Sequence, residues 1–149
     1  KNRNTIMIDS ILLVDDEDLF HLVFEDACSL LDITLSLTSV SSSDDASDMF
    51  KEWFKNGKGK PSCAFIDLNI LGSSFDGVEL IRKINFEYGN EVVVGIISSS
   101  NEESEKAKAI EAGAQFWIIK SDEIEPRLEE FKEDFKGYKS KSLPFKVYK

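Results

Sequence analysis

Short apolar runs alternate along this chain with longer segments of helical spacing, and this alternation constrains the fold more strongly than any other feature. Continuous apolar runs are typical of strands that are buried on both faces of a parallel sheet. Together with one alternating stretch, they predict five strands, at residues 8–14, 33–40, 63–67, 92–97 and 115–119. Apolar residues spaced three to four positions apart predict five helices, at about residues 18–31, 44–55, 77–88, 101–112 and 122–135.

The predicted element order is a (βα)5 repeat, which determines how the strands pair. Strand–helix–strand crossovers produce parallel pairing and place helices on both faces of the sheet. A doubly wound α/β sheet of strand order 2-1-3-4-5 fits best; this flavodoxin-like order is taken from known folds and not from residues of this chain. In such sheets ligands bind beyond the carboxyl ends of the strands, here at the switch point between strands 1 and 3.

The helical spacing also predicts which side chains are buried. Ser43 or Asp44 is expected to cap the second helix and Asp76 the third. The predicted inward positions are Leu19, Leu22, Val23, Ala27 and Leu30 of the first helix, Ala46, Met49, Phe50 and Trp53 of the second, Ala107 and Ile110 of the fourth, and Ile124, Leu128, Phe131 and Phe135 of the last. The aromatic residues that we assign to core packing are Phe20, Phe24, Phe50, Trp53, Phe54 and Phe65.

The composition restricts the classes of partner and compartment. With 18 basic and 28 acidic residues the net charge is −10, which disfavours direct binding of nucleic acid through its phosphates. No apolar stretch approaches the ~20 residues of a membrane helix, so we predict a cytoplasmic protein without membrane insertion. Residues 1–136 are expected to form one domain, followed by a basic tail at 137–149 and no separate output domain. Cys28 and Cys63 lie in apolar contexts and are expected to be buried free thiols.

Charged side chains follow three of the predicted strands at the point where each strand ends. Asp15 and Asp16 follow the first strand, Asp67 the third and Lys120 the fifth. Three carboxylates at one sheet edge repel one another, so either one is protonated or a cation binds. An all-oxygen ligand set with room for water favours Mg²⁺. Taken singly, each acid could instead be a helix cap or a solvated loop residue.

A cation beside carboxylates also attracts a phosphoryl group. Phosphoryl transfer depends mainly on positioning and on charge neutralisation, which Mg²⁺ and the Lys120 ammonium would supply. An aspartate can act as the nucleophile and form an acyl phosphate. The hydroxyls of Ser98 or Ser99, at the end of the fourth strand, could donate to that group. The alternatives are a surface lysine and serines that only cap a helix.

These segments together resemble the receiver domain of two-component response regulators, the CheY-like family, over about residues 8–136. Each segment is weak evidence alone, whereas their order and spacing are highly specific. The matching segments are Ile11-Leu12-Leu13-Val14-Asp15-Asp16-Glu17, Phe65-Ile66-Asp67-Leu68-Asn69, Asp76-Gly77-Val78-Glu79-Leu80, Ile96-Ile97-Ser98-Ser99 and Gly113-Ala114 through Lys120.

The resemblance implies a role for each of these acidic positions. Asp67 would be the phosphoacceptor, which receives the phosphoryl group from a kinase histidine. Asp16 and Asp67 would bind Mg²⁺ through their carboxylates and Asn69 through its backbone carbonyl, while Asp15 would act mainly through water.

The resemblance also implies residues that respond to the phosphoryl group. Ser98 matches the switch hydroxyl, because the family spacing from Gly113 selects it over Ser99. Lys120 matches the cationic partner, and Trp117 stands at the position of the aromatic switch residue. Ser121 follows Lys120 where the family has a cis proline. A cis bond before a non-proline residue costs about 3–4 kcal/mol, so a trans bond is expected here.

We therefore predict a single-domain response regulator that accepts a phosphoryl group on Asp67 with Mg²⁺ and is not itself an enzyme. A sensor histidine kinase or phosphotransfer protein would be the donor, and the downstream partner would be a protein of unknown identity. Two alternatives remain open. A degenerate receiver could act as an interaction module without phosphorylation. The altered Lys120-Ser121 pair and the loop from Asp67 to Asp76, which is longer than is usual in the family, motivate this reading. A phosphohydrolase with an aspartate nucleophile would need a second acid where this chain has Asn69.

Overall fold

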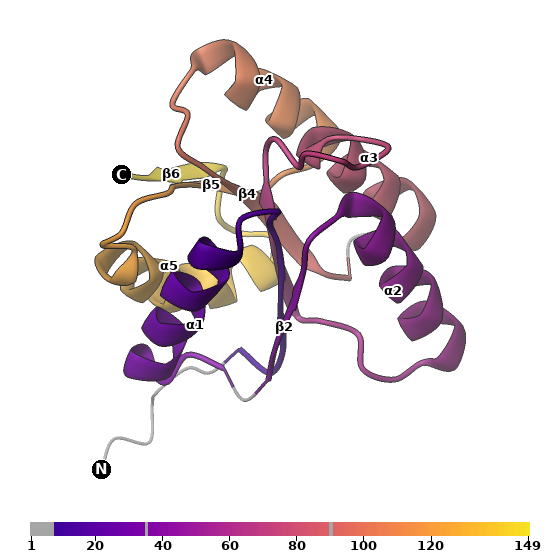
Figure 1. The fold of residues 1–149 in the computed structure, drawn as a ribbon, viewed down its shortest axis with the longest axis horizontal. Coiled ribbons are helices and arrows are strands. Elements are labelled where there is room, and N and C mark those ends of the chain that lie inside the picture. The colour runs from indigo at the N-terminus through magenta and orange to yellow at the C-terminus, as the bar shows by residue number, and fades with distance from the viewer. Residues whose placement is uncertain (1–7, 35, 90) are drawn as a thin grey trace.

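In the part of the chain that the structure describes, a parallel sheet of six strands runs through the centre, with helices on both of its faces (Figure 1). The computed structural model describes residues 8–34, 36–89 and 91–149. The strands are β1 (Ile11–Val14), β2 (Leu37–Val40), β3 (Cys63–Asp67), β4 (Val93–Ser98), β5 (Phe116–Ile119) and β6 (Lys146–Tyr148). The helices are α1 (Asp18–Leu31), α2 (Ser43–Asn56), α3 (Gly77–Tyr88), α4 (Glu103–Ala112) and α5 (Glu125–Lys139).

The strand order is β2-β1-β3-β4-β5-β6, so the predicted order 2-1-3-4-5 is confirmed and a sixth strand is added beside β5. All neighbouring strands pair in parallel. The register pairs Val14 with Ile66 and Asp67 with Ile97, while Ser98 pairs with Ile119. The residues that follow β1, β3, β4 and β5 therefore emerge together at one edge of the sheet.

Each face of the sheet is covered by its own hydrophobic cluster. Helices α1 and α5 pack together on one face, and α2, α3 and α4 cover the other (Figure 1). The first cluster contains stacked and edge-on aromatic rings, with Phe65 of β3 lying 5.1 Å from Phe24 and 5.0 Å from Phe131 between ring centroids. Cys28 and Cys63 are both buried free thiols, as predicted, and burial raises the pKa of Cys28 to about 12.

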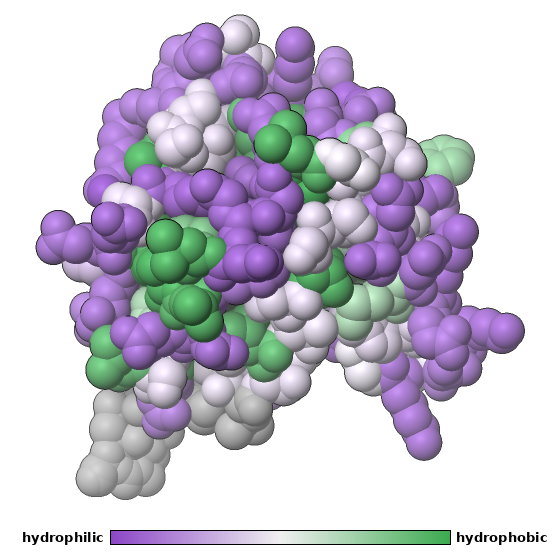
Figure 2. Space-filling view, in the orientation of Figure 1, coloured by the Kyte–Doolittle hydropathy of each residue, from purple (hydrophilic) through white to green (hydrophobic). Residues whose placement is uncertain are grey.

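The predicted inward face of α1 is shifted by about one residue position from the observed one: Ala27 is buried as predicted and Val23 is half-buried, but the three leucines are not buried. The helix buries Phe20, Phe24, Ala27 and Cys28. Leu19, Leu22 and Leu30 are exposed, and Figure 2 shows hydrophobic side chains gathered over α1. Both faces of this helix carry apolar residues at helical spacing, so periodicity alone did not distinguish them. The aromatic face packs against the sheet because large rings bury the most apolar area.

The predicted inward face of α4 is also wrong. Ala107 is exposed and Ile110 is half exposed, whereas Lys106, Ala109 and Ala112 are buried. Small alanine side chains let the helix approach the sheet, where they join the cluster that contains Trp117. Lys106 is buried along its stem and pairs with Glu103 at 2.9 Å.

The ends of two helices on this side are set by specific caps. The Ser42 side chain accepts a hydrogen bond from the backbone of Asp45, so the cap of α2 lies one position before the predicted candidates. Ser43 is buried, and its hydroxyl donates to the backbone carbonyl of Phe75 in the loop before α3. Asp76 caps α3 as predicted, in a reciprocal arrangement with Glu79.

Residues 137–149, assigned to a basic tail, form the last turn of α5, a connecting segment and β6. The ammonium of Lys146 lies 2.8 Å from both Glu130 and Asp134 on α5. The hydroxyl of Tyr148 donates to Asp134 at 2.6 Å and lies 2.8 Å from the hydroxyl of Tyr138. These contacts attach β6 to α5, so the end of the described chain is part of the folded domain.

Among the residues that the structure describes, no helix is both long and apolar enough to cross a bilayer.

Candidate functional site

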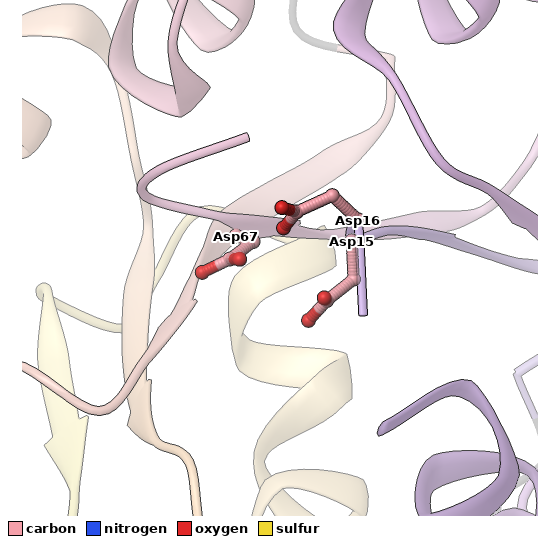
Figure 3. Close-up of side chains that lie close together, drawn as sticks. All are labelled: Asp15, Asp16 and Asp67. Carbon is pink, nitrogen blue, oxygen red and sulfur yellow. The ribbon is translucent and has the colours of Figure 1, made fainter. Parts of the chain in front are cut away.

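Three aspartates meet at the carboxyl edge of β1 and β3. Asp15 and Asp16 follow β1 and Asp67 ends β3, and one oxygen from each carboxylate lies within 4.8 Å of the others (Figure 3). Asp15 and Asp67 are buried and Asp16 is half-buried. The parallel register produces this arrangement, because it brings the residues after Val14 and Ile66 to the same level.

Asp67 is in an environment that opposes its negative charge. Burial raises the pKa of its carboxyl group to about 7, and the nearby charge of Asp15 contributes in the same direction. Lys120 partly offsets these effects. A buried carboxyl group among other acids gains much from a divalent cation, since the cation relieves both the repulsion and the desolvation cost.

The ammonium of Lys120 reaches across from the end of β5 to these acids. Its Nζ lies 2.8 Å from Asp15 Oδ2, 2.6 Å from Glu17 Oε1 and 3.6 Å from Asp67 Oδ2. It also lies over the Phe20 ring, 4.7 Å from the centroid. Burial lowers the pKa of Lys120, but the close carboxylates of Asp15 and Glu17 outweigh burial and raise it, so the lysine is a permanent cation.

Asp15 shows why this cluster suits a metal ion. Its Oδ1 accepts a hydrogen bond from the Glu17 backbone at 2.8 Å, which fixes the side chain. Its Oδ2 is buried and makes no well-directed hydrogen bond, although the charge of Lys120 lies beside it. A buried carboxylate oxygen without full hydrogen bonding, next to two further carboxylates, matches the ligand chemistry of Mg²⁺. The residues present therefore fit this ion.

Ser98 and Trp117 are linked through one residue of the loop after β4. Ser98 is buried, whereas Ser99 is exposed. The Ser98 hydroxyl oxygen accepts a hydrogen bond from the Ser100 backbone at 3.1 Å, and the Trp117 indole donates to the Ser100 carbonyl at 3.0 Å. Trp117 is fully buried. These two hydrogen bonds connect the Ser98 hydroxyl to the Trp117 indole through Ser100.

The remaining predicted residue, Asn69, lies in the loop after β3 and is exposed, beside a small cleft that Arg82 and Lys108 also line. Of the described peptide bonds none is cis, so the bond between Lys120 and Ser121 is trans, as expected. The structure thus assembles the acids, Lys120 and Ser98 at one edge, while the roles of all these residues stay predictions.

Sequence reasoning missed three residues of this site. Glu17 binds Lys120 directly, and Phe20 lies beneath its ammonium. The ring nitrogen Nε2 of His21 bonds the backbone carbonyl of Asp15. Glu17 was visible as a third acid directly after Asp15 and Asp16, but nothing in the sequence showed that it would reach a lysine on another strand.

Gly77 packs closely against the backbone of Asp67. A Cβ atom at this position would lie 2.1 Å from the Asp67 backbone oxygen, and the Gly77 amide donates to the Leu68 carbonyl at 3.0 Å. This close approach leaves no room for a side chain at position 77 and ties the start of α3 to the chain directly after β3.

We expect Gly77→Ala to destabilise the protein by about 1–3 kcal/mol, because the added methyl group forces the backbone at Asp67 to move. Mg²⁺ affinity should fall as well. Leu71→Ala is the control, since this side chain is 78% exposed in the same loop, and it should be near neutral. Urea unfolding and calorimetric Mg²⁺ titration measure both effects; equal stability and affinity for the two variants would contradict this expectation.

Comparison with known proteins places this site in a family. The model of the family described as response regulator receiver domain matches residues 11–129, which is most of the chain. The chain belongs to the response regulator receiver domain family. The predicted family is therefore confirmed. Receiver domains generally bind Mg²⁺ at an acidic site and interact with a histidine kinase or phosphotransfer partner, and this receiver domain has the aspartate cluster that such a site needs.

Solved structures of other receiver proteins show the same fold. A two-component response regulator from Cytophaga hutchinsonii is 25% identical with a TM-score of 0.76, covering 88% of this chain and 98% of that one. A CheY-like receiver domain protein from Methanospirillum hungatei is 15% identical with a TM-score of 0.72, over 90% and 98% of the two chains. NtrX from Brucella abortus is 22% identical with a TM-score of 0.76 over 91% of this chain, which spans only 29% of NtrX. No curated protein gives a significant match to this receiver domain.

Proposed function

We propose that this receiver domain accepts a phosphoryl group on Asp67 from a phosphohistidine donor and thereby changes a protein-binding surface. The observation that carries the proposal is the meeting of Asp15, Asp16 and Asp67 within 4.8 Å, with the Lys120 ammonium beside them. In this proposal the chain is a phosphoacceptor and not a turnover enzyme.

The residues of the chain have separate tasks in this reaction. An oxygen of Asp67 attacks phosphorus, the phosphorus–nitrogen bond to the donor breaks, and the leaving imidazole keeps the electron pair and takes up a proton. Mg²⁺ held by Asp15, Asp16 and Asp67, with the carbonyl of Asn69, would supply positive charge for the incoming oxygens. Lys120 supplies a second positive charge from the side of β5.

The response to phosphorylation is proposed to begin at Ser98. Its oxygen accepts the hydrogen bond from the Ser100 amide, and within the described part of the chain its hydroxyl hydrogen has no acceptor, so it can donate. Donation to a phosphoryl group on Asp67 would pull on Ser100 and thereby on the buried Trp117. The affected surface comprises α4, β5 and α5, and in this chain β6 lies along the outer edge of β5. A shift of a few kcal/mol between two arrangements is enough to change partner affinity.

Mg²⁺ affinity should depend on pH in the neutral range. The pKa of Asp67 is raised to about 7, so the carboxyl group is largely protonated below that pH and a proton competes with the ion. We expect Mg²⁺ to bind more weakly at pH 6 than at pH 8, and calorimetric titrations at the two values measure this. Asp67→Asn should lose most of the pH dependence. An equally steep dependence in that variant would assign the titration to another group.

Incubation with acetyl phosphate and Mg²⁺, followed by mass spectrometry with mapping of the modified residue, tests the proposal. We expect one phosphoryl group, on Asp67, and none when the ion is chelated. Absence of phosphoryl incorporation would instead indicate a degenerate receiver that acts as an interaction module. This holds whether the protein binds Mg²⁺ and beryllofluoride or binds neither. Continuous release of phosphate from small esters would support the hydrolase alternative.

A further inference from the structure

The ammonium of Lys120 is bound most closely by a residue that the proposed reaction does not use. Glu17 Oε1 lies 2.6 Å from Nζ and Asp15 Oδ2 lies 2.8 Å away, whereas Asp67 Oδ2 is 3.6 Å distant. An ammonium group has three protons and no acceptor. In the unphosphorylated protein, its two short ion-pair contacts are with Glu17 and Asp15, and Asp67 is beyond hydrogen-bond distance.

The two acidic partners of Lys120 differ in their freedom to move. Asp15 is fully buried and is fixed by the hydrogen bond from the Glu17 backbone. The Glu17 side chain is 62% exposed and stands at the N-cap position of α1, where it makes no capping hydrogen bond. Its carboxylate therefore does not stabilise the start of the helix. It can separate from Lys120 and be solvated at little structural cost.

The position of Lys120 is restricted on its other sides. Its Nζ lies over the Phe20 ring, and its side chain is mostly buried. Its backbone amide is fixed by a 2.8 Å hydrogen bond to the Ser98 carbonyl. The ammonium can therefore move only a short distance, between Glu17 at the solvent-exposed rim of the site and Asp67 inside it.

We propose that Glu17 is a positioning residue that holds the Lys120 ammonium toward the rim and competes for it with the phosphoryl group on Asp67. This inference rests on the function proposed above. A phosphoryl group on Asp67 adds negative charge on the inner side, and Lys120 moves from Glu17 to that group. The interaction with Glu17 is lost in the phosphorylated state. Glu17 therefore weakens the binding of Lys120 to the phosphoryl group by the free energy of the Glu17–Lys120 ion pair.

The expected effect follows from the exposure of Glu17. Ion pairs with one partner at the surface are weak, so their loss corresponds to a change of about two- to fivefold in an equilibrium constant. Glu17→Gln keeps the size of the side chain and removes its charge. It should bind beryllofluoride, a stable substitute for the phosphoryl group, two- to fivefold more tightly than wild type in the presence of Mg²⁺.

Two further variants separate the contact from net charge. Glu17→Asp retains the charge but is one methylene group shorter, so it should lose the contact and also bind beryllofluoride more tightly. Asp122→Asn removes an exposed acid that lines the same shallow cleft as Glu17 and Lys120, and it should bind as wild type does. In a Lys120→Met background, Glu17→Gln should have no effect, since the shared partner is gone.

Calorimetric titration with beryllofluoride and saturating Mg²⁺ provides the affinities, and thermal melts establish that each variant is folded. Equal affinity of wild type and Glu17→Gln would overturn the inference while leaving the proposed function intact. It would also be overturned if Glu17→Asp bound as wild type does, or if Glu17→Gln had the same effect without Lys120. Wild-type protein that binds no beryllofluoride at all would remove the proposed function and this inference with it.

Discussion

Asp67→Asn is expected to abolish phosphoryl incorporation from acetyl phosphate. An amide oxygen is a far poorer nucleophile than a carboxylate oxygen, and the replacement also removes one of three negative ligands for Mg²⁺. Mass spectrometry of the intact protein should show complete loss of the modified species. The control is Asp122→Asn, which replaces an exposed acid near the same edge and should incorporate the phosphoryl group as wild type does. Modification of Asp67→Asn at the wild-type level would place the acceptor elsewhere.

The same substitution is expected to stabilise the metal-free protein at pH 8. The pKa of Asp67 is raised from 3.8 to about 7, so the folded state binds the proton more tightly than the unfolded chain does. The stabilisation by this proton is present below pH 4 and is lost as the pH rises through about 7. Asparagine carries no charge, so its stability should lack this decline. Urea unfolding at pH 5.5 and pH 8 measures the difference.

Phe131→Ala should have the largest effect on stability, about 3–5 kcal/mol, because it leaves a cavity in a fully packed cluster. The Phe131 ring lies 5.0 Å from Phe65 of β3 and 4.6 Å from Phe116 of β5. It also contacts Tyr148 of β6, at 5.8 Å between centroids. One side chain on α5 thus connects three strands of the sheet, including the one that ends in Asp67.

The matched control is Phe86→Ala on α3, where the ring is 89% exposed. This variant should lie within about 0.5 kcal/mol of wild type, as surface substitutions usually do. Denaturant unfolding of both variants provides the comparison. A loss below 1 kcal/mol for Phe131→Ala would mean that the cluster on this face contributes less than its packing indicates.

The sequence was sufficient to predict the elements because most of them have one dominant pattern. The runs 63–67 and 92–97 are almost wholly apolar and can only be buried, and the structure contains strands at Cys63–Asp67 and Val93–Ser98. Predictions failed where two patterns coexist on one element. On α1 the leucines and the phenylalanines both recur at helical spacing, and the phenylalanines are buried while Leu19, Leu22 and Leu30 are exposed.

The strand at residues 146–148 was not predicted, for a different reason. Residues 146–148 form a strand of three residues, too short for periodicity to be detected. Its position depends on Asp134 and Glu130, which lie one helical turn apart on α5 and bind Lys146. Those contacts exist only after α5 has folded back along the sheet.

The sequence by itself determined the strand–helix alternation, the family and the identity of the acids at the strand ends, because each depends on local patterns or on motif order. Only the tertiary structure decided which helix faces are buried, that β6 extends the sheet, and that Glu17 binds Lys120. These features depend on contacts between segments far apart in the chain. Glu17 and Lys120 are separated by 103 positions, and no local pattern records their 2.6 Å approach.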